Sequence, residues 1–364
     1  VVLSEISNAG VSIWLDDLSR ERMVKGGKSS YLPDLIANKH VVGVTTNPAI
    51  FSNAISTSQL YQQDIIKMRN QGMEVEDIIT ELTCSDVRDA CDIFLDTFEK
   101  TSGIDGRVSI EVDPRYARDT EKTVAQARDL WKRIGAPNLL IKVPATKEGL
   151  PAIRELIAAG ISVNVTIIFS VSRYREVLEA YQSGIADRAN FGNKSSDTHS
   201  VASFFVSRVD TEIDARLKGI GRLDLLGKAA LANARLAYKE FIEVKSSSNW
   251  KKLAATGAFL QRPLWASTGV KEPSYDPAMY VTELIANETV NTMPESTLIA
   301  ASKTANFSGD TITGNFDSSK KIIDELGGLG INIEEVAKKL EEEGIEKFVK
   351  PWLDLISVVS KVSV

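Results

Sequence analysis

The stretch LLIKVPAT (residues 139–146) decides the fold class, because its apolar run has the pattern of a strand buried on both faces of a parallel sheet. Helical sequence follows at once: in residues 146–160, Leu150, Ile153 and Ile157 recur at three- and four-residue steps. A buried strand that leads directly into an amphipathic helix is the repeating unit of α/β folds. The stretch therefore predicts one βα unit of a larger parallel sheet.

The same unit recurs along the chain. Eight strands are predicted, at residues 12–16, 41–46, 107–113, 139–144, 162–168, 202–208, 262–268 and 288–293. Each leads into helical sequence, such as residues 119–135, which end in a glycine typical of a helix C-terminus. This alternation predicts an α/β fold of the (β/α)8 TIM-barrel class. Two βα sandwich domains are the alternative, but we find no linker rich in Pro, Gly or Ser to join them.

The expected organisation is a single (β/α)8 barrel domain over residues 1–364, with an extra N-terminal segment. A helical insertion at about 211–261 precedes the seventh strand, and within it residues 245–252 are interpreted as a loop between helices. A C-terminal helical tail at about 333–364 is expected to hold an amphipathic helix followed by an apolar one. The charge run of the tail is interpreted as a solvated face.

Composition narrows the class of protein. A net charge of −6 gives no electrostatic footprint for nucleic acid, and no apolar run approaches the ~20 residues that span a bilayer. Cys84 and Cys91 are spaced to lie on one helix face and are expected to be small core residues without a disulfide. With His40 and His199 as the two imidazoles, a zinc site is not expected. We expect a cytoplasmic protein without a metal.

Polar residues gather at the predicted C-terminal strand ends, which carry the chemistry in TIM barrels. They are Asp16, Thr45, Thr46, Asn47, Ser109, Glu111, Lys142, Asn164, Thr166, Ser203, Arg208, Ser267 and Lys271. Single residues have simpler interpretations: Asn47 as a turn before Pro48, Asp16 as a helix N-cap, and Glu111 as a surface residue. Their coincidence at equivalent ends of five or more strands favours one shared site.

Lys142 suggests the chemistry of that site. An ammonium group in a buried strand is costly unless it is paired or neutral, so the lysine lies either at a wet edge or where burial is useful. A neutral amine can attack a ketone and form a Schiff base, which then acts as an electron sink. Glu111, one strand away, is expected to move the protons, and Asp16 to act as base at a substrate hydroxyl. Arg208 and Lys271 are expected to hold a phosphate.

The remaining candidates are expected to contact the substrate. Hydrogen bonds to sugar hydroxyls are predicted for Asn47, Ser109, Asn164, Thr166 and Ser203. Thr46, directly before Asn47, and Ser267, at the end of the seventh predicted strand, complete the polar set of substrate-binding candidates. Phe205 is predicted to supply apolar surface beside the lysine.

Several segments closely resemble the transaldolase family. They are WLDDLSRERM, VVGVTTNPAIF, GRVSIEVDPRYARDT, LLIKVPAT, GISVNVTIIFS, VASFFVSRVD and RPLWASTGVK, which follow the family's order from residue 12 to residue 271. The resemblance implies an enzyme of the pentose phosphate pathway. Such an enzyme transfers a dihydroxyacetone unit from sedoheptulose 7-phosphate or fructose 6-phosphate to glyceraldehyde 3-phosphate or erythrose 4-phosphate.

The resemblance also implies residue roles and partners. Lys142 matches the Schiff-base lysine, Glu111 the acid/base glutamate, Asp16 the aspartate at the C4 hydroxyl and Arg208 a phosphate-binding arginine. No cofactor and no metal are expected. Sugar phosphates are the expected partners, with neither nucleic acid nor membrane, and the expected assembly is a monomer or homodimer. The length of the chain resembles the longer bacterial members.

One departure and two alternatives remain open. Many family members carry a second arginine after the seventh strand, in a stretch like ASFR, whereas this chain reads ASTGVK and offers Lys271 as the equivalent. A fructose-6-phosphate aldolase, which releases free dihydroxyacetone, is the nearer alternative. Phe205, where such aldolases tend to carry tyrosine, disfavours it. The other alternative is a non-catalytic sugar-phosphate-binding barrel, which would not need the Lys142, Glu111 and Asp16 set.

Overall fold

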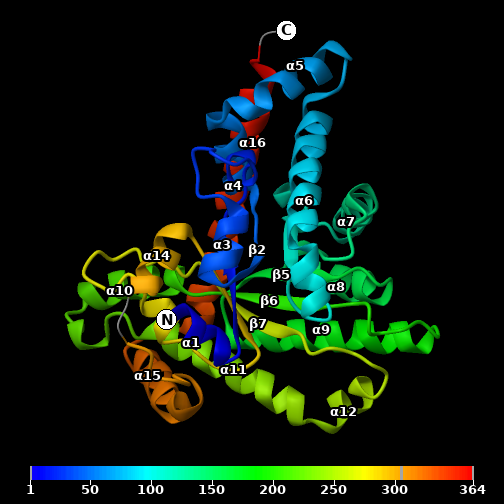
Figure 1. Cartoon of the computed structure of the whole chain (residues 1–364). Coiled ribbons are helices and arrows are strands. Elements are labelled where there is room, and N and C mark those ends of the chain that lie inside the picture. The colour runs from blue at the N-terminus through cyan, green and yellow to red at the C-terminus, as the bar shows by residue number, and fades with distance from the viewer. Residues whose placement is uncertain (1, 304–305, 363–364) are drawn as a thin grey trace.

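A closed barrel of parallel strands organises the molecule (Figure 1). The computed structural model describes residues 2–303 and 306–362. In that part of the chain, eight strands pair in sequence order from β1 to β8, and β8 closes the barrel on β1. The predicted (β/α)8 TIM-barrel class is therefore confirmed.

The strands lie close to their predicted positions. Their bounds are β1 Val11–Leu15, β2 Val41–Val44, β3 Arg107–Glu111, β4 Leu139–Pro144, β5 Val163–Ile168, β6 Ser200–Phe205, β7 Arg262–Ala266 and β8 Thr289–Met293. The strand predicted at 202–208 differs most, because the backbone turns into a helix at Ser207. Lys142 lies beside Glu111 of β3 and Asn164 of β5 in the strand register, so three candidate side chains are neighbours on adjacent strands.

Helices surround the barrel and extend beyond it. Their bounds are α1 Val2–Asn8, α2 Arg20–Met23, α3 Leu32–Lys39, α4 Pro48–Thr57, α5 Gln62–Asn70, α6 Val75–Lys100, α7 Thr120–Ile134, α8 Gly149–Ala158, α9 Val171–Asn190, α10 Ser207–Gly219, α11 Ala229–Ser246, α12 Ser248–Ala254, α13 Met279–Thr282, α14 Glu295–Lys303, α15 Phe316–Gly328 and α16 Ile333–Ser360. None of these helices, taken over the described residues, is long and apolar enough to cross a lipid bilayer. Cys84 and Cys91 of α6 are buried free thiols, as predicted.

The loop predicted at residues 245–252 is a correction. Helix α11 runs to Ser246 and α12 begins at Ser248, so the junction is Ser247 alone. Its extended backbone breaks the helical path, and its side chain accepts a hydrogen bond from the backbone N–H of Trp250. Three consecutive serines gave the appearance of a loop, whereas one N-cap serine is enough to start the next helix.

The two helices predicted for the C-terminal tail are a single helix, α16, which continues through Pro351. Proline in a helix interior removes one hydrogen bond, but Phe348 and Leu355 are buried on either side and hold the helix by tertiary packing. Figure 1 shows α16 leaving the barrel beside α4 to reach α5. There Nη1 of Arg69 donates a 2.7 Å hydrogen bond to the carbonyl of Ser360.

The charge run of α16 is not simply a solvated face, and that prediction is wrong in part. Lys339 pairs with Glu212 of α10 at 2.8 Å, and Glu341 pairs with Arg173 of α9 at 3.1 Å. The Glu341 side chain is only 16% exposed. These ion pairs tie the last helix to the helices that follow β5 and β6.

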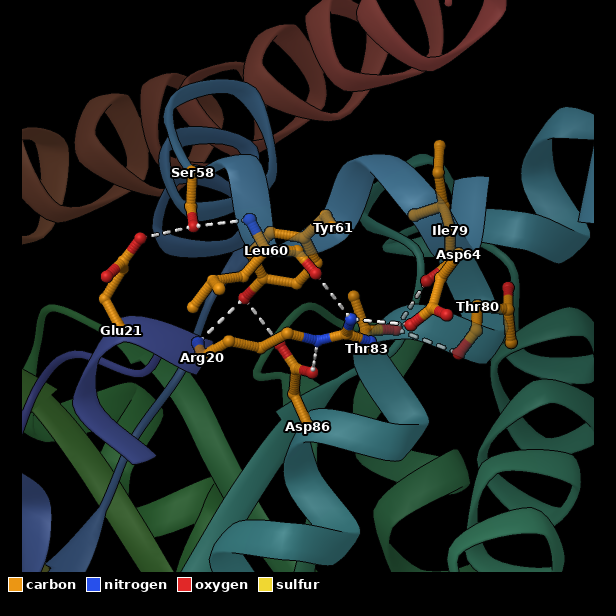
Figure 2. Close-up of polar contacts among 10 residues, drawn as sticks. All are labelled: Arg20, Glu21, Ser58, Leu60, Tyr61, Asp64, Ile79, Thr80, Thr83 and Asp86. Carbon is orange, nitrogen blue, oxygen red and sulfur yellow. Dashed lines mark hydrogen bonds and ion pairs between the residues drawn. The ribbon is translucent and has the colours of Figure 1, made fainter. Parts of the chain in front are cut away.

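A buried polar network joins the segment after β1 to the long α6 (Figure 2). Asp86 of α6 accepts a 2.9 Å hydrogen bond from Nε of Arg20 and a 2.6 Å bond from the hydroxyl of Tyr61. Arg20 also donates to Asp64 of α5 at 2.6 Å. Asp86 and Tyr61 are fully buried, so each satisfies a polar group that would be costly if left alone.

Candidate active site

Lys142 occupies the interior of the barrel near the C-terminal end of β4. It is 4% exposed, and its Nζ donates a 2.9 Å hydrogen bond to the backbone carbonyl of Thr46. The same nitrogen lies 3.5 Å from Oε2 of Glu111. Lys142 is therefore buried within the barrel and lies beside a carboxylate, and the wet-edge alternative does not apply.

Glu111 is as deeply buried as the lysine. Its side chain is 2% exposed, and neither carboxylate oxygen has a hydrogen-bond partner among the described residues apart from the Lys142 contact. Burial raises the pKa of Glu111, the charge and hydrogen bond of Lys142 oppose that rise, and the nearby Asp16 adds to it. A carboxyl group in this setting can exchange a proton with the amine beside it. The alternative of a strand-end surface residue is wrong.

Asp16 follows β1 directly and is held by a neighbouring strand. The hydroxyl of Thr45 donates a 2.6 Å hydrogen bond to Oδ1 of Asp16 and lies 2.6 Å from the hydroxyl of Thr292 on β8. Burial raises the pKa of Asp16, whereas Lys142 and the Thr45 hydrogen bond lower it. Asp16 does not cap the helix that follows, because the N-cap of α2 is Ser19. It is a half-buried carboxylate that faces the lysine site.

Five of the predicted substrate-binding residues are buried in the barrel interior. Ser203 donates a 2.6 Å hydrogen bond to Oδ1 of Asn164, and Nδ2 of Asn164 donates to Ser109 at 3.1 Å. The hydroxyl of Thr46 donates to the backbone carbonyl of Ser109, and that of Thr166 is buried without a partner among the described residues. Of these five, only Ser203 reaches the cavity described next.

A cavity of about 230 Å³ opens above this network at the C-terminal ends of the strands. It is lined by Asp16, Thr45, Asn47, Lys142, Ser203, Phe205, Arg208, Ala266, Ser267, Gly269, Lys271, Thr292, Pro294 and Phe348. Eight of these were predicted as site residues, so the structure brings together candidates from five strand ends. Glu111 reaches the cavity only through its contact with Lys142.

Sequence reasoning assigned no role to Thr45, Thr292 and Phe348. Thr292 had a usable signal: it pairs in register with Trp14 near the end of β8, so the strand-end argument extended to the eighth strand would have found it. Thr45 directly precedes two chosen residues. Phe348 lies on α16, far from any strand end, and nothing in the sequence places it here.

The side chain of Asn47 can serve as a helix cap through its oxygen and as a ligand contact through its nitrogen. It is the N-cap of α4, and its side-chain oxygen accepts a 2.9 Å hydrogen bond from the backbone N–H of Ile50. The cap uses only the oxygen, which leaves the amide nitrogen able to donate to a ligand in the cavity. Asn47 therefore begins a helix, and the interpretation of it as only a turn is not what the structure shows.

Two cationic side chains, Arg208 and Lys271, line the cavity. Arg208 lies in the first turn of α10, and its buried Nη1 has no hydrogen-bond partner among the described residues. Burial lowers the pKa of Arg208, and the negative charges of Glu111 and Asp16 oppose this. Lys271 is exposed after β7, and the Ser267 hydroxyl lies 2.8 Å from that of Ser207. These cationic side chains can receive an anion.

A larger cavity, of about 530 Å³, lies at the opposite end of the barrel. Its charged groups already pair with one another: Arg262 contacts Asp105 at 3.0 Å, and Asp105 accepts a 2.6 Å hydrogen bond from Ser12. Burial and the nearby arginines lower the pKa of His199 to about 3, so this imidazole is neutral. That end lacks an amine beside a carboxyl group among its described lining residues, and the smaller cavity is therefore the candidate active site.

Comparisons with known proteins agree with this geometry. A profile of the family Transaldolase/Fructose-6-phosphate aldolase matches residues 13–359. A transaldolase of Mycolicibacterium smegmatis is 53% identical over 357 residues, which cover 97% of this chain and 95% of the relative. A transaldolase of Saccharopolyspora erythraea is 52% identical and covers 98% of this chain and 96% of its own length. One of Thermobifida fusca is 49% identical and covers 99% and 97%. The chain belongs to the transaldolase/fructose-6-phosphate aldolase family.

Proposed function

We propose that this protein is a transaldolase that moves a dihydroxyacetone unit from a ketose phosphate to an aldose phosphate. The donor is sedoheptulose 7-phosphate or fructose 6-phosphate, and the acceptor is glyceraldehyde 3-phosphate or erythrose 4-phosphate. The observation that carries the proposal is the buried pair of Lys142 and Glu111, 3.5 Å apart, at the base of a polar cavity. A site that only bound sugars would not need this pair, which supports a Schiff-base enzyme.

Imine formation is the first step. The neutral Nζ of Lys142 attacks the C2 carbonyl carbon of the donor and forms a carbinolamine. Glu111 takes the proton lost by the amine and returns a proton to the departing hydroxyl, which leaves as water. The Thr46 carbonyl, which accepts a hydrogen bond from Nζ, orients the lysine for this attack.

Carbon–carbon cleavage follows. Asp16 takes the proton of the C4 hydroxyl, the C4 oxygen forms a carbonyl, and the C3–C4 bond breaks with its electron pair passing to the imine. The aldose leaves, and the three-carbon unit stays on Lys142 as an enamine. Attack of the enamine on an acceptor aldehyde reverses these events, and water then releases the new ketose.

Individual binding roles follow from position. Asn47 and Ser203 are proposed to bind sugar hydroxyls directly, whereas Asn164 and Ser109 support Ser203 through hydrogen bonds and Thr166 and Thr46 are buried nearby. Arg208 and Lys271 are proposed to hold the terminal phosphate, with Ser267 beside them. Phe205 closes the apolar side of the cavity.

One assay distinguishes this function from its alternatives. The protein is mixed with fructose 6-phosphate, with and without erythrose 4-phosphate, and the products are separated by mass. Sedoheptulose 7-phosphate that forms only with the acceptor supports a transaldolase. Free dihydroxyacetone formed without the acceptor would identify an aldolase, and the absence of any product would leave a binding protein.

The organisation of the protein is proposed on separate grounds. We infer one barrel domain over residues 1–364 that includes the insertion at about 211–261 and the tail from about 333. The buried, unbridged Cys84 and Cys91 support a reducing compartment, for which we propose the cytoplasm. The net charge of −6 fits a protein that uses neither nucleic acid nor membrane, and the family resemblance is the ground for proposing a monomer or homodimer.

A further inference from the structure

We propose that Phe348 of α16 is a positioning residue for Arg208, so that the C-terminal helix sets the affinity for phosphorylated substrates. The inference rests on the proposed function, because it concerns the residue assigned there to the phosphate. It goes further because it adds α16 to the site. This helix comes after β8 in the sequence and contributes no strand-end residue.

The geometry places the guanidinium of Arg208 between two aromatic rings. Its central carbon lies 5.4 Å from the ring centre of Phe205 and 5.7 Å from that of Phe348. Both rings line the candidate active site, and Phe348 is 5% exposed. A cation near two desolvated aromatic faces is attracted to each of them, so both rings restrict the position of the arginine.

This mode of support leaves the charge of Arg208 available. Other partly buried arginines, such as Arg20 and Arg173, are held by carboxylates that neutralise them. Arg208 makes no ion pair of that kind within the described residues, and its buried Nη1 has no hydrogen-bond partner there. An arginine held by rings keeps both its charge and its N–H donors for an anion.

The helix that carries Phe348 approaches Arg208 closely, and the charge of Glu343 on that helix acts on the guanidinium without an ion pair between the two among the described residues. Gly344, one turn before Phe348, is so close that an added Cβ would lie 3.6 Å from Nη1 of Arg208. That is ordinary contact, so the glycine leaves the arginine enclosed on that side without a polar side chain. The Phe348 ring is therefore the part of α16 that lies directly against the guanidinium.

An ion pair maintains the spacing between the two helices. Lys339 of α16 contacts Glu212 of α10 at 2.8 Å, and Glu212 lies one turn after Arg208 on the same helix. The helix that carries the ring is thereby tied to the helix that carries the arginine. This ion pair helps to keep the Phe348 ring beside the Arg208 guanidinium.

Three variants of α16 test the proposal in the full-length protein. Phe348→Leu keeps apolar volume but removes the ring, Phe348→Tyr keeps the ring, and Leu355→Ala weakens the packing of the same helix at a buried position outside the cavity. We expect Phe348→Leu to raise KM for fructose 6-phosphate about tenfold with little change in kcat. In Phe348→Leu, turnover of unphosphorylated fructose should stay within about twofold of the unmodified protein. Phe348→Tyr, which keeps the ring, should have the KM of the unmodified protein.

The outcomes separate this inference from the function on which it rests. An equal rise of KM in Leu355→Ala, or equal losses on both donors in Phe348→Leu, would overturn the positioning role. Arg208→Ala tests the phosphate assignment independently, because it should impair fructose 6-phosphate far more than fructose. If Arg208→Ala impairs fructose 6-phosphate more than fructose but Phe348→Leu impairs both equally, only the inference fails. Equal impairment of fructose 6-phosphate and fructose by Arg208→Ala would remove the phosphate assignment.

A double variant gives the sharpest result. When Arg208 is replaced by alanine, the Phe348 ring has no guanidinium to hold, so Phe348→Leu should then have almost no further effect on KM. Additive effects of the two changes would show that Phe348 acts on the substrate or on the helix, and would contradict positioning through Arg208.

Discussion

At the scale of single residues, Lys142 shows how a costly feature indicates function. An ammonium group in a strand of Leu, Ile and Val is unfavourable unless something compensates for its burial. The structure surrounds Nζ with the Thr46 carbonyl and the Glu111 carboxyl group, which together can orient the amine and exchange its proton. The same contacts make the position chemically useful.

The first prediction concerns the covalent intermediate. Incubation with fructose 6-phosphate and borohydride should attach a substrate-derived mass to the peptide that contains Lys142, and activity should disappear in step with labelling. Lys142→Arg should abolish both, because a guanidinium keeps its charge and cannot form the imine. Lys271→Arg is the matched control and should still be labelled at Lys142. Labelling at any other lysine would contradict the assignment.

The second prediction concerns pH. Asp16 must be ionised to accept a proton, and burial raises its pKa above the ordinary value of 3.8. Protonation therefore begins at a higher pH than for an exposed aspartate, and kcat/KM should fall as the pH falls, with an acidic limb displaced upward. Glu111, whose pKa is also raised, contributes to the same limb. The pH profile of kcat/KM measures this, and a limb at the value of a free carboxyl group would contradict it.

A variant isolates the aspartate. Asp16→Asn should leave imine formation intact while slowing carbon–carbon cleavage, so that borohydride traps more of the donor-derived imine than in the unmodified protein. Failure to form any imine in Asp16→Asn would assign the residue a structural role instead.

At the scale of elements, the candidate site is built where each strand ends and the next helix begins. Each barrel strand is short and buried, and a polar residue that follows it can both cap the next helix and line the cavity. Asn47 is the clearest example, because its oxygen caps α4 while its nitrogen is able to donate into the cavity. The same local sequence therefore starts a helix and forms a site.

The third prediction separates these two functions of Asn47. Asn47→Ala should lower the free energy of unfolding by about 1 kcal/mol through loss of the cap, and should also raise KM. Asn47→Ser keeps a capping oxygen but lacks the amide nitrogen, so it should preserve stability to within a few tenths of a kcal/mol while KM still rises. Urea unfolding and steady-state kinetics measure the two effects. A normal KM in Asn47→Ser would exclude the amide from substrate binding.

At the scale of the whole molecule, contacts between distant segments complete the barrel. The α16 helix crosses from the active site to α5, and the network around Asp86 joins the segment after β1 to α5 and α6 (Figure 2). Neither feature belongs to the repeating βα unit. Both join segments that are far apart in the sequence.

The fourth prediction concerns this network. Asp86→Ala leaves the Tyr61 hydroxyl without an acceptor and Arg20 without its buried partner, so the free energy of unfolding should fall by about 2–4 kcal/mol. Because none of these residues lines the cavity, KM for fructose 6-phosphate should change little at temperatures where the variant is folded. The exposed Asp96→Ala, which breaks a surface pair with Lys100, is the control and should cost less than about 1 kcal/mol.

The sequence by itself determined the barrel class, the strand positions and the three residues proposed for catalysis. These follow from local signals: a buried strand is a short apolar run, a helix has its own periodicity, and a polar residue at a strand end is visible without any long-range contact. The bounds of β4 and the burial of Lys142 agree with that pattern. The family segments added the roles expected of Lys142, Glu111 and Asp16.

Only the tertiary structure decided which polar residues reach the cavity and which support it from below. Asn164 and Ser109 are inward-facing like Ser203, but their depth in the barrel depends on the tilt and stagger of the strands, which no single strand reveals. The place of Phe348 against Arg208 was also decided there. It depends on packing between residues 140 positions apart, and local sequence carries no record of such a contact.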